Sequence, residues 1–404
     1  MENERASALP SRFVTVAVLL LASTTIMSNA TIAPSLPGLK EHFATVNGID
    51  TLAGLLLSLP SLSILLTAGI FGWLADRMDR QPLLLIAGLL VVLGGTSGLW
   101  AQSLMQMLIG RVVLGVGVGG TMTLAFAWGA ELWQGQARAR FMGLQGAAVS
   151  AGGVVALILG GALAALHWRG AFAVYLTALP ITLIAYAALA PHARALQARR
   201  ATTERLTKAG ADGAFPWAMY AFVGGLAFLL MTGFYIMPTR VPFHLTALGT
   251  TNTLVIAAIM ALVTLVSTPG ALLYGRMRRF LSPVTIFAMS FGLMAAGLVM
   301  VGLSHSAWLV AVGGIFAGLG LGPSMPNFTT YFNSFVPPSQ RGRAAGLLTT
   351  AFFAGQFASP LISAPLVAWL GLNGAFIAVG LVFAGIATGL ALMVMTRNEV
   401  AQAA

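Results

Sequence analysis

The sequence predicts an all-α membrane protein with twelve transmembrane helices arranged as two six-helix pseudo-repeats. Of the 404 residues, 58% are hydrophobic and only 8% are charged, and the mean hydropathy is +0.90. A water-soluble domain has no place for so much apolar surface. Apolar runs of about 20 residues, the length that crosses a bilayer as a helix, recur along the chain. The two halves of the chain also resemble each other.

Polar or charged breaks separate twelve apolar runs. We expect helices rather than barrel strands, because a run such as 83–100 is continuously apolar, whereas the strands of a membrane barrel alternate apolar with polar residues. The predicted spans are residues 13–35, 51–74, 83–101, 105–129, 142–166, 171–190, 217–238, 251–274, 282–303, 307–332, 344–368 and 373–396.

The distribution of basic residues predicts the topology. An even number of spans places both termini on one side, and most Arg and Lys residues fall on that side, whereas Lys40, Arg169 and Arg240 fall on the opposite side and Arg111 lies inside a span. Because basic loops stay in the cytoplasm, we expect both termini to be cytoplasmic, in a bacterial inner membrane. The predicted domains are a six-helix bundle at 1–190, a basic linker at 191–215 and a second bundle at 216–404.

An internal repeat supports two bundles. The segment QARARFMGLQGAAVSAGG (136–153) aligns with SQRGRAAGLLTTAFFAGQ (339–356), which superposes an R-x-R-x-x-G-L pattern. Parallel repeats of this kind are typical of transporters in which two bundles rock about a central site.

The loop after the second predicted span, within GWLADRMDRQPLLL (72–85), concentrates charge in a chain that has little. With Glu131, an acid at the inner end of the fourth span, these loop charges can form a cluster of opposite charges. A carboxylate is stabilised at a helix N-terminus, and one changed charge breaks a buried cluster of this type. The alternative interpretation is that these charges only set the topology.

This loop resembles the G-x-x-x-D-R-x-G-R-x-x signature of the major facilitator superfamily, and the resemblance extends over essentially the whole chain. The resemblance implies a cytoplasmic gate made of Gly72, Asp76, Arg77, Arg80 and Glu131, in which Asp76 caps a helix of the opposite half and the arginines pair with Glu131 to hold the gate shut. Asp79 stands where the family usually has Gly, which puts the geometry of the loop in question.

Glycine motifs also resemble the drug/proton antiporters of that superfamily. The fourth span contains RVVLGVGVGG (111–120), and the fifth keeps part of an antiporter pattern but has Ala156 and Leu157 in place of Gly-Pro. We expect these glycines to allow close helix packing. They are Gly115, Gly119, Gly143, Gly152, Gly160 and Gly161.

The predicted substrate cavity is apolar with one positive charge. None of the ten acidic residues lies at mid-membrane, so no buried carboxylate is available to pair with a cationic drug. Neutral, zwitterionic or anionic amphiphiles, such as phenolic antibiotics or siderophore-like metabolites, suit such a cavity. The residues expected to line it are Arg111, Asn29, Tyr235, Asn327, Gln356 and Phe352. Each polar one has an alternative role in a hydrogen bond between helices, and Arg111 has the alternative of reaching the membrane surface.

Several functions are excluded or unsupported. The five His residues, expected at span ends or in loops, form no metal or catalytic pattern, Cys is absent, and no phosphate-binding loop is present. We therefore expect no enzyme, metal, cofactor or nucleic-acid partner, and a monomer in the lipid bilayer. The predicted function is proton-driven efflux of small molecules. The alternatives are uptake or facilitated transport of an organic anion and, from another class, a membrane sensor that transports nothing.

Overall fold

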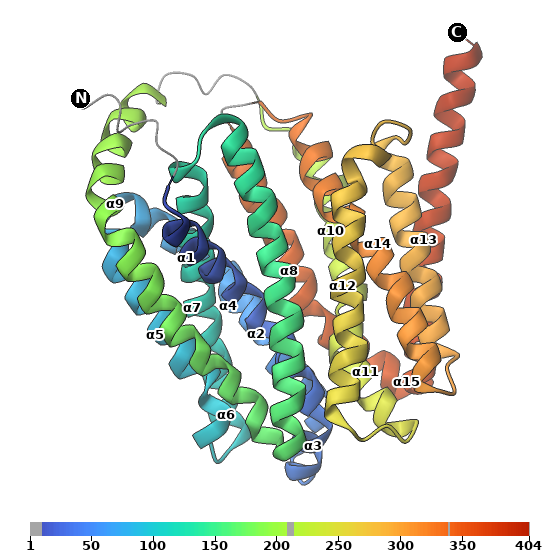
Figure 1. Ribbon diagram of the computed structural model, residues 1–404. Coiled ribbons are helices and arrows are strands. Elements are labelled where there is room, and N and C mark those ends of the chain that lie inside the picture. The colour runs from blue at the N-terminus through green and yellow to red at the C-terminus, as the bar shows by residue number, and fades with distance from the viewer. Residues whose placement is uncertain (1–9, 208–213, 338–339, 404) are drawn as a thin grey trace. The chain divides into compact units, whose positions relative to one another are not determined.

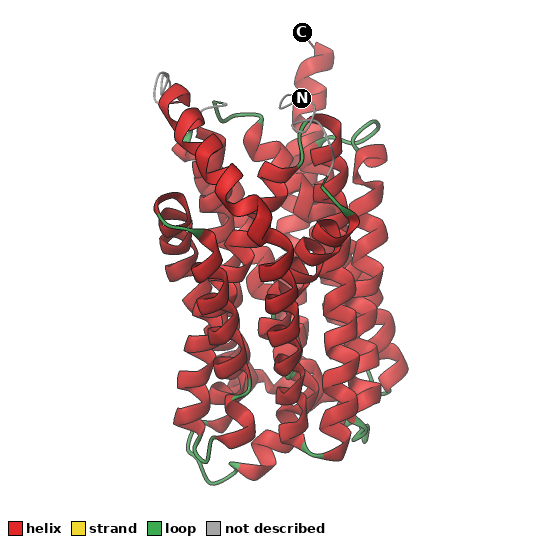
Figure 2. Ribbon diagram, turned by 60° about the vertical axis from the view of Figure 1, so that its left-hand side comes forward, coloured by secondary structure: helices red, strands yellow, loops and turns green. Residues whose placement is uncertain are grey.

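The computed structural model describes residues 10–207, 214–337 and 340–403, and every regular element in these ranges is a helix (Figures 1 and 2). The elements are α1 Arg12–Ser23, η1 Thr24–Ile26, α2 Met27–Ala30, η2 Ala33–Ser35, α3 Leu36–His42, α4 Ile49–Arg77, α5 Arg80–Gly95, α6 Ser97–Trp100, α7 Leu104–Leu132, α8 Gly135–Leu166, η3 Trp168–Thr177, α9 Ala178–Thr207, α10 Trp217–Phe234, α11 Ile236–Ala247, α12 Thr253–Met277, α13 Pro283–Gly302, α14 Ala307–Asn333 and α15 Arg341–Ala403.

Ten of the described helical segments are long and apolar enough to cross a membrane, against the twelve spans predicted. Two local features account for the difference. The first predicted span, 13–35, is interrupted by short 3-10 turns, one of them at Pro34, and its longest apolar stretch is Arg12–Ile26. The last two predicted spans form one element, α15, with a kink at Gly371, whose φ of 69° and ψ of 175° favour a residue without a Cβ atom.

Side-chain caps begin several helices. Ser103 and Gln106 form a reciprocal capping box at the start of α7. The side-chain oxygens of Asn252 and Ser282 accept hydrogen bonds from backbone N–H groups in the first turns of α12 and α13. These caps satisfy backbone donors that would otherwise lack partners at the helix ends.

Glycine allows helices to approach closely at most of the predicted positions. A Cβ atom at Gly115 would lie 2.5 Å from the Pro60 carbonyl oxygen, and at Gly119 and Gly152 it would also meet neighbouring atoms at under 3 Å. Gly160 is buried, and a Cβ atom at Gly161 would overlap Ala257. The packing role predicted for Gly143 is wrong, because this residue is exposed and a Cβ atom there would meet nothing within 4 Å.

The contacts of the chain define two compact units. Within the described residues, unit 1 comprises 10–31, 59–156 and 172–207, and unit 2 comprises the remainder. Unit 2 therefore contains two segments of the first predicted bundle, 32–58 and 157–171, together with the second predicted bundle. The boundaries predicted at 190 and 216 stay a prediction.

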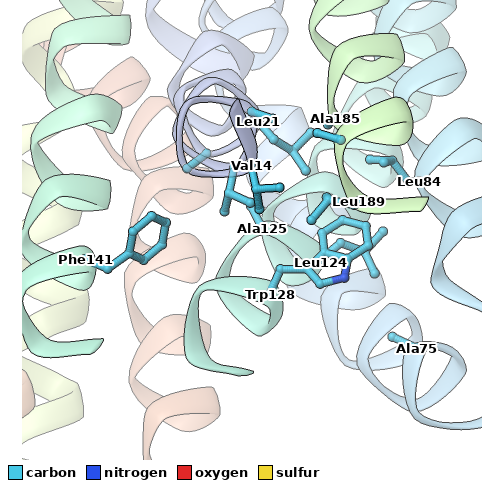
Figure 3. Packing of buried hydrophobic residues seen from close by; sticks show 14 of the residues in the cluster. Val14, Leu21, Ala75, Leu84, Leu124, Ala125, Trp128, Phe141, Ala185 and Leu189 are labelled. Carbon is cyan, nitrogen blue, oxygen red and sulfur yellow. The ribbon is translucent and has the colours of Figure 1, made fainter. Parts of the chain in front are cut away.

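A hydrophobic core holds unit 1 together (Figure 3). Helices α1, α5, α7 and α9 contribute to it, and the Trp128 side chain of α7 is 1% exposed between them. The same cluster includes Val14, Leu21, Leu84 and Leu189. Burial of such large side chains stabilises the unit by about 1.5–3 kcal/mol each.

Candidate functional site

Arg80 and Glu131, which the sequence assigned to a gate, form an ion pair in unit 1. The Arg80 Nη1 and Nη2 atoms donate to the two Glu131 carboxylate oxygens at 3.1 and 3.0 Å. Arg80 Nε donates to the Ala75 carbonyl oxygen at 3.3 Å. The Arg80 side chain is 6% exposed and that of Glu131 is 28% exposed. This bidentate ion pair connects the first residue of α5 to the end of α7.

The other charged residues of the loop are exposed. The Arg77 guanidinium lies over the Trp73 ring at 4.1 Å, and Asp76 is accessible to solvent. Asp79 has an extended backbone, with φ −62° and ψ 131°, and its carboxylate accepts the backbone N–H of Gln81 at 3.1 Å. The position therefore needs no glycine, because its φ is negative and Asp79 acts as the N-cap of α5.

Gly72, the remaining gate residue, is half-buried in α4. A Cβ atom there would lie 3.9 Å from Thr123 of α7, which is ordinary van der Waals contact. The predicted gate residues thus divide into one partly buried ion pair, two exposed charged side chains and a half-buried glycine.

Arg111 is completely buried in unit 1. Its Nη1 donates to the Tyr175 hydroxyl at 2.9 Å, and its guanidinium carbon lies 4.8 Å from the Phe172 ring centre and 5.1 Å from that of Tyr175. Its Nε and Nη2 atoms have no hydrogen-bond partner. The alternative in which this side chain reaches the membrane surface is wrong, because its exposed fraction is 0%.

Sequence reasoning missed Tyr175 as the partner of Arg111. The two residues belong to α7 and η3, and a Cβ atom on Gly95 of α5 would overlap the Tyr175 ring, so the tyrosine occupies space that this glycine leaves. No local spacing links these positions, although the glycine itself was a usable signal of close packing.

Arg240, which the sequence predicts on the side of the membrane opposite the termini, is also a buried arginine. The residue is 2% exposed within α11 of unit 2. Its Nε donates to Ser363 Oγ and its Nη1 to the Asp50 carbonyl oxygen, both at 3.3 Å, while Nη2 has no partner. The Asp50 carboxylate pairs with Lys40. Arg240 therefore connects segments from both predicted bundles within one unit.

His244, one turn further along α11, lies in the last turn of that helix, at the end of the span, and is buried. It is 2% exposed, and its Nε2 atom lies 2.7 Å from Ser304 Oγ. The predicted span 217–238 therefore ends too early, since α11 continues to Ala247.

Close contacts accompany Arg240 where segments of the two predicted bundles meet in unit 2. Thr253 Oγ1 donates to the Gly161 carbonyl oxygen at 2.8 Å, which joins α12 to α8. A Cβ atom on Gly54 would lie 2.8 Å from the Pro360 Cβ atom. We name the contacts of Arg240, Thr253–Gly161 and Gly54–Pro360 the junction.

The other predicted cavity residues differ in their surroundings. Asn327 is fully buried, its Oδ1 accepts from the Tyr274 hydroxyl at 3.3 Å, and its Nδ2 donates to the Pro283 carbonyl oxygen at 2.9 Å. This residue bridges helices α14, α12 and α13, so we withdraw it from the candidate cavity.

Gln356 and Phe352 are half-buried on α15 of unit 2. The Gln356 amide nitrogen lies 3.8 Å from the Met231 sulfur, and Phe352 packs edge-on against Phe328 at 5.6 Å. Tyr235, between α10 and α11, is 7% exposed. The side chain of Asn29 lies outside the described residues. A role for these four residues in substrate binding stays a prediction.

The buried charge of the described residues is positive. Arg80, Arg111 and Arg240 are buried, and no Asp or Glu in the described ranges is buried to the same extent. Only Arg80 has a carboxylate among the hydrogen-bond partners named above. The described ranges also contain no group of three His, Asp or Glu side chains placed to hold a metal ion.

Comparison with known proteins identifies the family. The Major Facilitator Superfamily matches residues 18–282 and 227–404. The chain is 34% identical over 147 residues to the class C tetracycline resistance protein of Escherichia coli, and this alignment covers 35% of each chain. It is 30% identical over 122 residues to myo-inositol transporter 2 of Schizosaccharomyces pombe, covering 30% of this chain and 22% of that protein. The chain thus matches about a third or less of the length of these relatives.

Solved structures share the fold. The human organic anion transporter MFSD10 (TETRAN) superposes with a TM-score of 0.66 at 18% identity, covering 95% of this chain and 100% of that one. A D-xylose-proton symporter superposes with a TM-score of 0.71 at 16% identity, covering 94% and 96%. Together with the helical, apolar architecture and the repeat, these matches show that the chain is a multi-pass membrane protein that belongs to the Major Facilitator Superfamily, a family of transporters and not of enzymes.

Proposed function

We propose that this protein is a secondary transporter that exports neutral, zwitterionic or anionic amphiphilic small molecules by alternating access, driven by protons. Similarity to tetracycline resistance proteins of Escherichia coli and Pasteurella multocida supports efflux. The excess of basic residues on one side of the predicted topology supports a bacterial inner membrane with both termini in the cytoplasm.

The observation that carries the substrate class is the buried charge of Arg111. Its described polar contact is the neutral Tyr175 hydroxyl, and two of its three guanidinium nitrogens have no hydrogen-bond partner. A cation inside a low-dielectric protein attracts an anionic group and repels a protonated amine. Because Arg111 is fully buried in this structure, we propose that it acts on the substrate through its electrostatic field, or by direct contact in a more open state.

The two charged clusters suit the two gates of such a cycle. The Arg80–Glu131 pair braces the inner end of unit 1, where the exposed Asp76 and Arg77 are available to reach the opposite half in another state. The junction ties segments of both bundles together within unit 2. A transporter that alternates access needs contacts of this kind that form and break.

Purified protein in proteoliposomes tests the proposal. An imposed pH gradient should drive accumulation of an anionic or neutral amphiphile and should not drive a permanently cationic one of similar size. Arg111→Ala should lose this transport while remaining folded, and Arg111→Lys should recover little because a lysine cannot reproduce the planar guanidinium. Arg279→Ala removes an exposed arginine from a loop and serves as the matched control. Normal transport by a well-folded Arg111→Ala protein would refute the role of this charge.

A second candidate function is facilitated transport or uptake of an organic anion. The described buried charges are consistent with it, and a structural neighbour carries the name of an organic anion transporter. Counterflow of a labelled organic anion without a pH gradient would favour this function over proton-driven efflux. No flux in either assay would favour a membrane sensor.

A further inference from the structure

Unit 2 contains a cavity of about 480 Å³ that none of the residues proposed above for gating or substrate binding lines, apart from Thr253 of the junction. Its walls come from η2 and α3, from the end of α8 and the start of η3, and from the first residue of α12, Thr253. The volume is in the range of pockets that hold small organic molecules. Because Thr253 also bonds to Gly161 in the junction, the cavity lies directly beside the contacts that tie the two bundles together.

Flat aromatic rings line this cavity. Trp168, the first residue of η3, packs against α3 where Gly38 leaves room, since a Cβ atom there would lie 3.0 Å from the Trp168 Cβ atom. The His42 and His167 rings lie 5.1 and 5.7 Å from the Trp168 ring, at 40° and 30° to it. His167 Nδ1 accepts the backbone N–H of Arg169 at 3.2 Å, so in a neutral ring the proton is on Nε2.

One carboxylate lines the cavity. Glu41 is the acidic residue among the lining side chains. The neighbouring Lys40 pairs with Asp50. The Arg169 guanidinium lies over the Trp168 ring at 4.6 Å, a cation–π contact of the kind that an indole makes with a planar cation. An exposed carboxylate beside aromatic rings is a combination that recognises organic cations.

We propose that this cavity is a binding site for a small planar organic cation, such as an aromatic amidinium or a protonated heteroaromatic amine. The occupant contacts α3, the α8–η3 turn and α12 together, so it stabilises the junction and slows any motion that separates these segments. A metal ion is a poorer fit, because His167 Nδ1 is occupied and no group of three ligands is in place among the described residues. The site is separate from the proposed transport of neutral and anionic molecules.

Isothermal titration calorimetry of the full chain in detergent tests the binding, with benzamidine as the cation and benzamide as its uncharged analogue. We expect saturable binding of benzamidine and at least tenfold weaker binding of benzamide. Glu41→Gln should weaken benzamidine binding at least fivefold, and Asp79→Asn, a carboxylate-to-amide change at an exposed residue that does not line the cavity, should leave it unchanged. Equal binding of the two compounds, or binding that ignores Glu41→Gln, would overturn the proposed site.

Spin labels test the effect on the junction. The chain has no cysteine, so Asn47→Cys and Thr251→Cys introduce two exposed labels on loops of unit 2. Benzamidine should increase the population of the shorter label distance in the doubly labelled protein and should have no effect when Glu41→Gln is added. Unchanged distances at saturating benzamidine would refute the stabilising role. Both measurements are made without transport, so they stand or fall independently of the proposed export.

Discussion

Glu131→Gln removes the charge of the Arg80 partner with little change in shape. In the structure, two of the three guanidinium hydrogen bonds described for Arg80 go to Glu131, and the third, to Ala75, remains in the variant. Removing one member of a fully buried ion pair costs about 3–5 kcal/mol, and an exposed pair contributes about 0–1 kcal/mol.

The burial of the pair places the expected loss between these limits. Arg80 is 6% exposed, which leaves its charge poorly solvated, but Glu131 is 28% exposed, so water replaces part of the lost contact. We expect Glu131→Gln to lower the free energy of unfolding by about 2 kcal/mol, which is about a thirtyfold change in the unfolding equilibrium constant.

A double-mutant cycle with Arg80→Met measures this interaction directly. Equilibrium unfolding of the four proteins in mixed detergent micelles, followed by tryptophan fluorescence, gives the coupling free energy. We expect the double variant to be more stable than the sum of the single losses predicts, by about 1–3 kcal/mol, because the buried arginine no longer lacks a partner. Additive losses, with a coupling free energy below about 0.5 kcal/mol, would refute the reasoning.

Three further predictions follow from the same structure. Asp76→Asn should change the free energy of unfolding by less than about 0.5 kcal/mol, because Asp76 is exposed. The same variant should lower the transport rate and shift spin-label distances across the cytoplasmic face. Unchanged distances would count against a gate role. Arg240→Met should increase labelling of a cysteine at Thr253 by an impermeant maleimide, and Arg240→Lys should do so less, since it keeps the charge that holds the junction; equal labelling in all three proteins would contradict this. Gly115→Ala should destabilise the protein by about 1–3 kcal/mol, because its Cβ atom would lie 2.5 Å from a carbonyl oxygen. Gly143→Ala, which places its Cβ atom in open space, should be neutral or slightly stabilising. Equal thermal unfolding midpoints for the two variants would show the packing argument to be wrong.

The candidate site was predictable where the chemistry is local. Arg80 and Glu131 were identified because charges are rare in this chain and because the loop that contains Arg80 resembles a family signature whose arginines pair with an acid at the position of Glu131. Asp79 was misjudged, since the sequence does not report that its φ is negative and that its carboxylate caps α5. Whether a side chain bonds another helix or faces a cavity was left open for Asn327, because hydrogen bonds across helices depend on rotation about each helix axis.

The membrane-spanning helices, the repeat and the scarcity of acids in the apolar runs could be predicted from the sequence, because apolar run length and charge are properties of composition and order. The surroundings of Arg111 and Arg240 could not be predicted in this way. Arg111 meets Tyr175, and Arg240 meets Asp50 and Ser363, across separations of 64, 190 and 123 residues. A hydropathy pattern has no information about such contacts, because they arise when helices pack and enclose polar groups that must find partners away from water.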